Sequence, residues 1–368
     1  MAHVLVTGST GLVGQCLLEE LIKRGARVTC IGRSRNGVQF ADRLRQLLRG
    51  RLFTHLPRAE TVVKAIDGDL ADLTGLNLVD VPDHVIHVAA LTDFRSGPSA
   101  AARLDAVNVQ GTARLVDAIA DLPSPPRSFT LVSSAYSANI RPGHVMPEDG
   151  DLDGPFHNPY QRSKLEAEHL VRSHFAESPT HVRIFRPTVV SGRLDRSPRG
   201  FVPKYDVYLG WAKFFLAMKN EVGTSTLPVR IAANLALGLN IVPADFVGAC
   251  IAAAVLSDDP ETSIHVCAPE DLPIGPMLTA LLRSVEVDGW QFVDHPPVDP
   301  SDIERAYYSS VGAAYTSYIA GDAPWIFDAT SLERLCRRGD VPRRGVSTPE
   351  DFQIMLDFAR SSNWGLPS

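Results

Sequence analysis

Ser134, Tyr160 and Lys164 are residues whose types, taken together, can assist hydride transfer to a carbonyl group. Hydride arriving at the carbonyl carbon leaves charge on the oxygen, which then needs a proton donor and a second hydrogen bond. Tyr160 can supply the proton and Ser134 the hydrogen bond. Lys164 follows the tyrosine by one helical turn, so its ammonium group, with the positive nicotinamide of an oxidised cofactor, would lower the tyrosine pKa from its usual value of about 10. The Tyr-x-x-x-Lys pair alone also fits a solvated helix face, so the reading depends on the surrounding elements.

Asn108 is a fourth candidate for catalysis. It stands at the expected start of a helix that carries Leu115, Val116 and Ile119 on one side. Its side chain can complete a proton relay to the tyrosine or can cap the helix, and the sequence leaves both roles open.

The elements that must position these groups begin with a glycine-rich loop. An apolar run at residues 3–6 predicts a buried strand, and the spacing of apolar residues over 17–22 predicts a helix. Between them, Gly8 permits a sharp exit from the strand, Gly11 lets a pyrophosphate approach the backbone, and Gly14 lets the helix pack closely on the sheet. The G-x-x-G-x-x-G spacing is a variant of the dinucleotide fingerprint, so the loop predicts a dinucleotide site.

Strands and helices alternate along the next part of the chain. Further strands are expected at 27–31, 62–66, 84–88, 129–132 and 181–186. Helices are expected at 40–58, from Asn108, and from Pro159. This alternation predicts an α/β fold, a Rossmann-type doubly wound parallel sheet with right-handed crossovers.

The rest of the chain predicts a smaller, mostly helical C-terminal substrate lobe. A strand, turn and helix at 240–247 return to the main fold, and tail helices are expected near 276–285, 301–318, 330–337 and 349–361. We therefore expect a dinucleotide-binding domain over 1–192, with 235–270 returning to it. The lobe would comprise 193–234 and 271–368.

The end of the second strand bears on the choice of cofactor. An enzyme that uses NAD usually has an acidic residue here for the ribose 2′-hydroxyl, whereas an arginine suits a 2′-phosphate. The sequence has Arg33 and Arg35 at this place, and Arg33 is the better placed of the two. We therefore favour NADPH, with a solvated surface arginine as the alternative.

The composition excludes several classes of protein. The formal net charge of -6 gives no basic field for nucleic acid, and 45% of the 368 residues are hydrophobic, enough for a substantial core. The five cysteines are scattered, which fits buried thiols and no metal site. The first strand begins at once, leaving no room for a signal peptide, and no apolar run reaches membrane-spanning length. A cytoplasmic enzyme is expected.

The glycine loop, Ser134 and the segment Tyr160-x-x-Ser163-Lys164 together resemble the extended short-chain dehydrogenase/reductase superfamily. Within it, several segments are similar to the branch of fatty acyl-CoA reductases and carrier-protein thioester reductases: 51–53, 68–70, 75–76, 87–94, 108–112, 132–136 and 185–192. Residues 325–328 with Leu332 resemble, less specifically, the C-terminal lobe of acyl-CoA reductases. The likeness covers about residues 3–250 well.

The resemblance implies an NADPH-dependent reduction of an acyl thioester to an aldehyde, with reduction onward to the alcohol left open. Because this sequence includes no adenylation or carrier domain, the thioester would arrive as a CoA ester or on a separate acyl or peptidyl carrier protein. By position, Asp69 and Leu70 would flank the adenine, Ala89 and Ala90 the pyrophosphate and ribose, and Pro187 and Val190 the nicotinamide amide. The expected NADP(H) contacts are Gly8, Thr10, Gly11, Leu12, Gly14, Arg33, Asp69, Leu70, Ala89, Ala90, Lys164, Pro187 and Val190.

Other functions remain open at this point. The runner-up is a ketone, aldehyde or hydroxysteroid-type reductase of the same superfamily. A nucleotide-sugar epimerase or dehydratase is disfavoured by Arg33, and a cofactor-binding regulator by the presence of all three catalytic residue types. The segment 208–218 is either a lid over an acyl chain or pantetheine arm or an ordinary buried helix.

Overall fold

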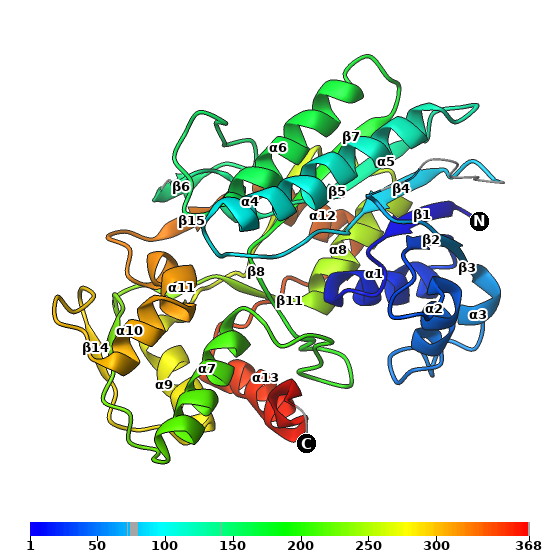
Figure 1. Cartoon of the computed structure of the whole chain (residues 1–368). Helices are drawn as coiled ribbons and strands as arrows, with labels where there is room; N and C mark the ends of the chain where they lie inside the picture. The colour runs from blue at the N-terminus through cyan, green and yellow to red at the C-terminus, as the bar shows by residue number, and fades with distance from the viewer. Residues whose placement is uncertain (72, 74–79, 141, 367–368) are drawn as a thin grey trace.

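A seven-stranded parallel sheet forms the centre of the computed structural model, which describes residues 1–71, 73, 80–140 and 142–366 (Figure 1). The strand order is β3-β2-β1-β4-β5-β7-β12, the doubly wound order with one strand added at the edge. The bounds are β1 (His3–Thr7), β2 (Arg27–Gly32), β3 (Val63–Asp67), β4 (His84–His87), β5 (Ser128–Val132), β7 (His181–Pro187) and β12 (Ser263–Val266). The predicted Rossmann-type sheet is confirmed. The edge strand β12 had no individual prediction.

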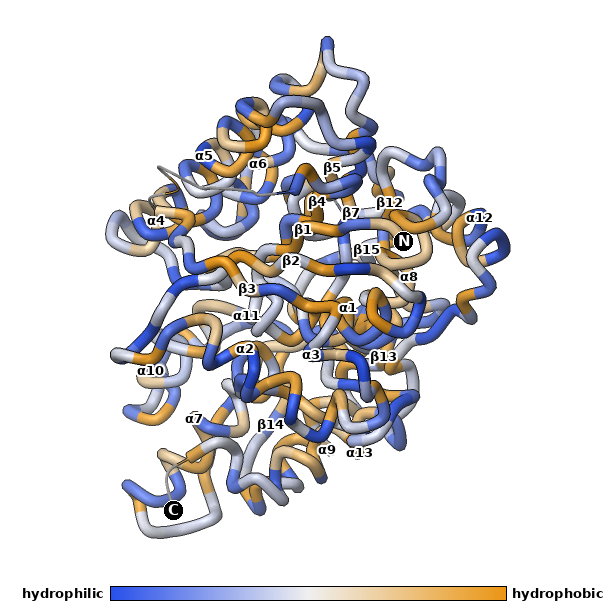
Figure 2. Tube along the Cα trace, turned by 90° about the vertical axis from the view of Figure 1, so that its right-hand side faces the viewer, coloured by the Kyte–Doolittle hydropathy of each residue, from blue (hydrophilic) through white to orange (hydrophobic). Residues whose placement is uncertain are grey.

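Helices cover both faces of this sheet, as Figure 1 shows. One face carries α1 (Leu12–Lys23), α2 (Phe40–Leu48) and α8 (Ala244–Leu256); the other carries α4 (Pro98–Leu104), α5 (Gln110–Ala120) and α6 (Pro159–His174). Gly248 allows α8 to approach α1 closely, because a Cβ there would lie 2.7 Å from the backbone nitrogen of Leu17. In Figure 2 the central strands and α1 are mainly hydrophobic, in keeping with their burial.

The C-terminal lobe has a second hydrophobic core of its own. It is built from α7 (Tyr208–Val222), α9 (Ile274–Ser284), α10 (Asp302–Tyr308), α11 (Val311–Ile319), α13 (Pro349–Ser361) and the strand pair β9 (Arg230–Ala232) and β14 (Gln291–Val293). The side chains of Tyr208, Trp211 and Phe215 on α7 are buried in this core, which agrees with the expectation of an ordinary buried helix.

Short strands outside the central sheet form separate two-stranded pairs. The pairs are β8 (Val189–Ser191) with β11 (Ile241–Pro243), β6 (Gly143–Val145) with β15 (Trp325–Phe327), and β10 (Gly238–Leu239) with β13 (Leu272–Pro273). The remaining short helices are α3 (Ala59–Val62), the 3-10 turns Ala135–Ser137 and Asn363–Gly365, and the π-helical turn Asp105–Val109. Because β15 pairs with β6, the C-terminal part of the chain contacts the segment that follows β5 in a separate two-stranded sheet.

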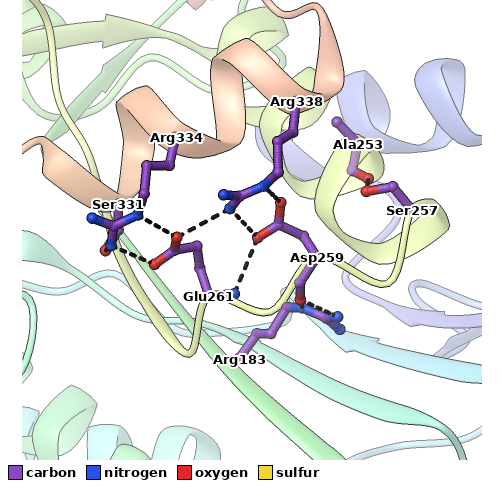
Figure 3. Close-up of polar contacts among 8 residues, drawn as sticks. All are labelled: Arg183, Ala253, Ser257, Asp259, Glu261, Ser331, Arg334 and Arg338. Atoms are coloured by element: carbon purple, nitrogen blue, oxygen red, sulfur yellow. Dashed lines mark hydrogen bonds and ion pairs between the residues drawn. The ribbon is translucent and has the colours of Figure 1, made fainter.

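The helix α12 (Thr330–Gly339) is held beside β12 by a cluster of charged residues, drawn in Figure 3. Arg334 donates to both carboxylate oxygens of Glu261 at 2.6 and 2.8 Å, and Arg338 does the same to Asp259 at 2.7 and 2.8 Å. Arg183, on β7, donates to the backbone carbonyl of Asp259. Apolar side chains of α12 join the core of the sheet. The boundary expected at residue 271 therefore does not describe the packing of α12.

Several expected helix bounds are wrong. The helix expected from about Asn108 is α5, which begins at Gln110, but α4 and the π-helical turn that continue it toward the N-terminus were not expected. The helix expected over 40–58 ends at Leu48. The helix expected over 301–318 is broken between Tyr308 and Val311. Among the described residues, no helix combines the length and apolar character that crossing a membrane requires.

Candidate active site

The glycine loop has the geometry of a dinucleotide cradle. Gly8 has φ +75°, and a Cβ on it would lie 2.5 Å from the backbone nitrogen of Ala89. A Cβ on Gly14 would lie 2.1 Å from the carbonyl oxygen of Gly8. Gly11 is exposed at the N-cap of α1, where no side chain caps the helix and its first turn holds no acidic residue. The free N–H groups of this turn therefore fit a pyrophosphate.

The other expected cofactor residues lie along the same edge of the sheet. The edge is formed by the carboxyl ends of the parallel strands, where open α/β sheets bind their ligands. Arg33 follows β2, Asp69 and Leu70 follow β3, Ala89 and Ala90 follow β4, Pro187 ends β7, and Val190 lies in β8. The structure therefore brings the predicted set to one edge.

The position of Arg33 is set by two neighbours. Its guanidinium lies 3.7 Å from the carboxylate of Asp69, and both side chains are exposed. Arg43, on α2, donates to the backbone carbonyl of Arg33 at 2.8 Å. Arg43 also lines a cavity of about 470 Å³ with Thr10 and Arg51. The sequence analysis missed Arg43, although the Arg residues in the expected 40–58 helix are a signal that could have found it.

Ser134 occupies the turn directly after β5. Its hydroxyl oxygen accepts a hydrogen bond from the backbone nitrogen of Tyr136 at 3.3 Å. Among the described residues, no group accepts the Ser134 hydroxyl proton. The hydroxyl proton of Ser134 is therefore available for a hydrogen bond to a ligand oxygen, and its role toward a substrate stays a prediction.

A buried carboxylate holds the turn that carries Ser134 by hydrogen bonds to the residues on either side of it. Glu168, on α6, accepts hydrogen bonds from the hydroxyls of Ser133 and Ser137. Arg186, on β7, donates to the two Glu168 oxygens at 2.6 and 3.0 Å. Each partner of this ion pair has 2% of its side chain exposed. The pair therefore holds β7, α6 and the serine turn together.

Lys164 and Tyr160 both lie on α6, but their side chains meet different partners. Lys164 Nζ donates to the carbonyl of Val132 at 2.6 Å, two residues before Ser134. Burial lowers the pKa of Lys164 to about 8, against a smaller raising effect of Glu168. Burial raises the pKa of Tyr160 to about 12, although a hydrogen bond with Thr92 acts in the other direction. Lys164 is not among the groups that shift the pKa of Tyr160 in the chain alone, so its expected effect together with the nicotinamide charge stays a prediction.

Asn108 lies inside a continuous helix, at the π-helical turn, so the alternative role as a helix cap is wrong. Its side chain exchanges two hydrogen bonds with the backbone of Leu91, at 2.7 and 3.0 Å, and donates to the Ser163 hydroxyl at 3.0 Å. Ser163 in turn donates to the carbonyl of Tyr160 at 2.8 Å. Asn108 therefore ties the loop after β4 to the catalytic helix, which suits positioning as well as a relay.

The ring of Phe94 links Tyr160 to aromatic side chains of the lobe. Phe94, in the loop after β4, contacts Tyr160 edge to face at a centroid distance of 5.1 Å. The same ring contacts Tyr315 at 5.6 Å and Tyr318 at 6.4 Å, both on α11. Tyr160 therefore packs against a ring that also contacts α11 of the lobe.

The lowered pKa of Lys164 predicts the pH dependence of catalysis. Below a pH of about 8 the lysine is charged, and we expect this charge to stabilise the phenolate that proton donation would leave on Tyr160; above that pH the charge is lost. We expect kcat/KM to fall above a pH of about 8 in an initial-rate profile. In Lys164→Arg the guanidinium stays charged and the decline should disappear. An identical alkaline decline in the variant would contradict the assignment.

The sheet order, the glycine cradle and a Tyr-Lys helix beside a strand-end serine define the class: an extended short-chain dehydrogenase/reductase, an oxidoreductase that uses a nicotinamide dinucleotide. The sequence model of the male sterility protein family matches residues 6–251. The chain belongs to this family.

The following curated proteins are similar in sequence to parts of this chain. Nonribosomal peptide synthetase 5 of Gibberella zeae is 30% identical over 202 residues, 51% of this chain and 2% of that protein. Fatty acyl-CoA reductase 1 of Rattus norvegicus is 26% identical over 284 residues, 67% of this chain and 52% of the reductase. A bifunctional UDP-glucose and UDP-xylose 4-epimerase of Arabidopsis thaliana is 28% identical over 208 residues, 54% of this chain and 56% of the epimerase. The chain thus spans about half the length of the last two.

The fold is similar to that of a solved reductase domain. The terminal R domain from the myxalamid PKS-NRPS biosynthetic pathway superposes with a TM-score of 0.75 at 21% identity. The match covers 99% of this chain and 92% of that domain, so the likeness in fold includes the C-terminal lobe.

Proposed function

We propose that the protein reduces an acyl thioester to an aldehyde with NADPH. The observation that carries carbonyl reduction is the free hydroxyl proton of Ser134, positioned beside the helix of Tyr160. The choice of a thioester is supported by membership of the male sterility protein family and by relatives named as a fatty acyl-CoA reductase and a peptide synthetase. A CoA ester or a carrier-bound thioester is the corresponding substrate.

Ser134 and Tyr160 act on the carbonyl oxygen of the thioester. NADPH, when bound on the glycine cradle, supplies the hydride. Ser134 donates a hydrogen bond to the thioester carbonyl, and Tyr160 delivers its proton to the oxygen as the negative charge develops. The product of this addition is a hemithioacetal. When its C–S bond breaks, the thiol takes the hydroxyl proton and the aldehyde is released. Lys164 stabilises the phenolate until it is reprotonated from solvent.

A substrate panel tests this function. NADPH oxidation is followed with acyl-CoA esters, acyl thioesters of N-acetylcysteamine, ketones and aldehydes, and thiol release is measured in parallel. We expect cofactor oxidation and thiol release in equal amounts with thioesters. Turnover of ketones or aldehydes alone would contradict the proposal and favour the runner-up reductase.

The likeness to a 4-epimerase supports a second, weaker candidate. An epimerase returns the hydride to its substrate, so UDP-sugar conversion would proceed without net oxidation of the cofactor. The absence of an acidic residue at position 33 speaks against it, because Arg33 stands where the 2′-hydroxyl of NAD is usually bound. Conversion of a UDP-sugar by the purified protein would establish this candidate.

Arg33 and Arg43 predict a preference for NADPH. Their side chains lie at the carboxyl end of β2, where a 2′-phosphate would reach them, and charge-assisted hydrogen bonds of this kind contribute about 1.5–3 kcal/mol each. We expect Arg43→Ala to lower kcat/KM for NADPH by about 10- to 100-fold and to leave kcat/KM for NADH unchanged. Arg45→Ala is the matched control, because Arg45 lies on the same helix but pairs with Asp42. Equal losses with both cofactors would contradict the assignment.

A further inference from the structure

Tyr318 lies between the lobe and the catalytic helix. It comes from α11, and its ring contacts Tyr136 at 5.2 Å and His157 at 5.3 Å. On another side it contacts Phe94 at 6.4 Å, the ring that also contacts Tyr160 at 5.1 Å. Tyr318 therefore borders the place where the substrate carbonyl must lie.

The Tyr318 hydroxyl oxygen accepts two hydrogen bonds from the first turn of α6. Asn158 Nδ2 and Gln161 Nε2 each donate to it at 2.9 Å. The orientation of both amides is fixed by their other ends. Asn158 Oδ1 accepts from the Gln161 backbone nitrogen at 3.1 Å, and Gln161 Oε1 accepts from the His157 backbone nitrogen at 2.9 Å. Flipping either amide would break one of these bonds, so both NH₂ groups must face Tyr318.

This arrangement determines what the phenol proton can do. The oxygen of Tyr318 already accepts two hydrogen bonds, so the hydroxyl can only donate its proton to a further group. In the described part of the chain, no oxygen or nitrogen accepts it. Burial raises the pKa of Tyr318 well above its usual value, so the hydroxyl keeps this proton at neutral pH. An oriented donor without an acceptor thus stands beside Tyr160.

We propose that Tyr318 donates a hydrogen bond to a carbonyl or hydroxyl oxygen of the bound substrate, other than the oxygen that is reduced. This role rests on the proposed thioester reduction and assigns the substrate a second oxygen near the reacting carbon. Two sources have that chemistry: a 3-oxygen substituent on the acyl chain and the amide carbonyl of the pantetheine arm. Tyr318 is then a specificity-determining residue contributed by the lobe.

Paired substrates test this inference with Tyr318→Phe. The first pair is an acyl thioester with and without a 3-hydroxyl group. The second pair is the same acyl group on N-acetylcysteamine and on pentane-1-thiol, which lacks the amide. In the wild-type protein we expect kcat/KM to favour the oxygen-bearing member of one pair by about three- to tenfold, as one hydrogen bond would give. In Tyr318→Phe that preference should vanish, because the ratio compares two substrates on one enzyme and cancels general damage to the fold.

Tyr308→Phe is the matched control. The Tyr308 hydroxyl also makes two hydrogen bonds, from the Ala232 nitrogen and to the Arg230 carbonyl, each at 2.9 Å. The Tyr308 hydroxyl thus donates its proton to a backbone group of the lobe and has none left for a substrate. We expect Tyr308→Phe to lose stability but to keep the wild-type ratio of kcat/KM within each substrate pair.

Two outcomes overturn the inference: a wild-type protein without preference in either pair, or a preference that survives in Tyr318→Phe. The pair that responds identifies the acyl chain or the pantetheine arm as the source of the oxygen. If the wild-type protein reduces no thioester, the proposed function fails. Ketones with and without a neighbouring hydroxyl then test Tyr318 by the same ratio.

Discussion

Tyr160→Phe is expected to lower kcat for thioester reduction by about 10²- to 10⁴-fold, the range for losing a general acid. The reason is that phenylalanine keeps the ring contact with Phe94 but removes the proton donor. Ser134 alone can then hold the carbonyl oxygen without protonating it. The KM for NADPH should change little, because Tyr160 is not among the residues that we expect to hold the cofactor.

The control for this variant is Tyr307→Phe. The Tyr307 hydroxyl accepts a hydrogen bond from the indole of Trp211 at 3.2 Å, in the core of the lobe. We expect this variant to retain most of the wild-type kcat. Single-turnover measurements on both variants separate hydride transfer from product release. A Tyr160→Phe protein that keeps half of the wild-type single-turnover rate would refute the assigned mechanism.

Arg186→Met is expected to destabilise the fold by about 3–5 kcal/mol, because it leaves the Glu168 carboxylate charged and buried without its partner. The loss is measured by urea unfolding at neutral pH. In the double variant Arg186→Met/Glu168→Leu neither charge of this ion pair remains, so part of the stability should return. The recovery is partial because the hydroxyls of Ser133 and Ser137 lose their acceptor.

A surface ion pair provides the comparison. Arg49 and Glu60 form two hydrogen bonds, at 2.9 and 3.0 Å, with both side chains exposed. We expect no measurable change in stability from Arg49→Ala, because water solvates the remaining carboxylate. If Arg186→Met were no more damaging than Arg49→Ala, the anchoring role of Glu168 under the serine turn would be wrong.

Local patterns were enough to predict the sheet and the tight glycine positions after its first strand. Gly8 and Gly14 stand at turns where the structure leaves no room for a Cβ, and this requirement is visible as spacing in the sequence. The strands are short apolar runs between helices, so their order follows from general rules for parallel sheets. The break between Tyr308 and Val311 was missed, because the apolar pattern continues across it.

The candidate site was predicted only in part. The four-residue spacing of Tyr160 and Lys164 fixes a shared helix, but it does not show that Lys164 turns to the Val132 carbonyl. Asn108 looked like a helix start because no local signal marks a π-helical turn. Tyr318 was missed because its partners Asn158 and Gln161 are far away in the sequence. Contacts of that kind depend on tertiary packing, which no local pattern records.

The pairing of β15 with β6 has a consequence for synthesis of the protein. Trp325 aligns with Gly143 and Phe327 with Val145, so β6 pairs with a strand that is synthesised much later. Such pairing has a high contact order and forms late. A ribosome adding about 5–20 residues per second would expose the unpaired edge of β6 for many seconds. Nascent chains stalled before residue 325 should therefore be cleaved by protease around residues 143–145, and chains stalled well after α12 should resist.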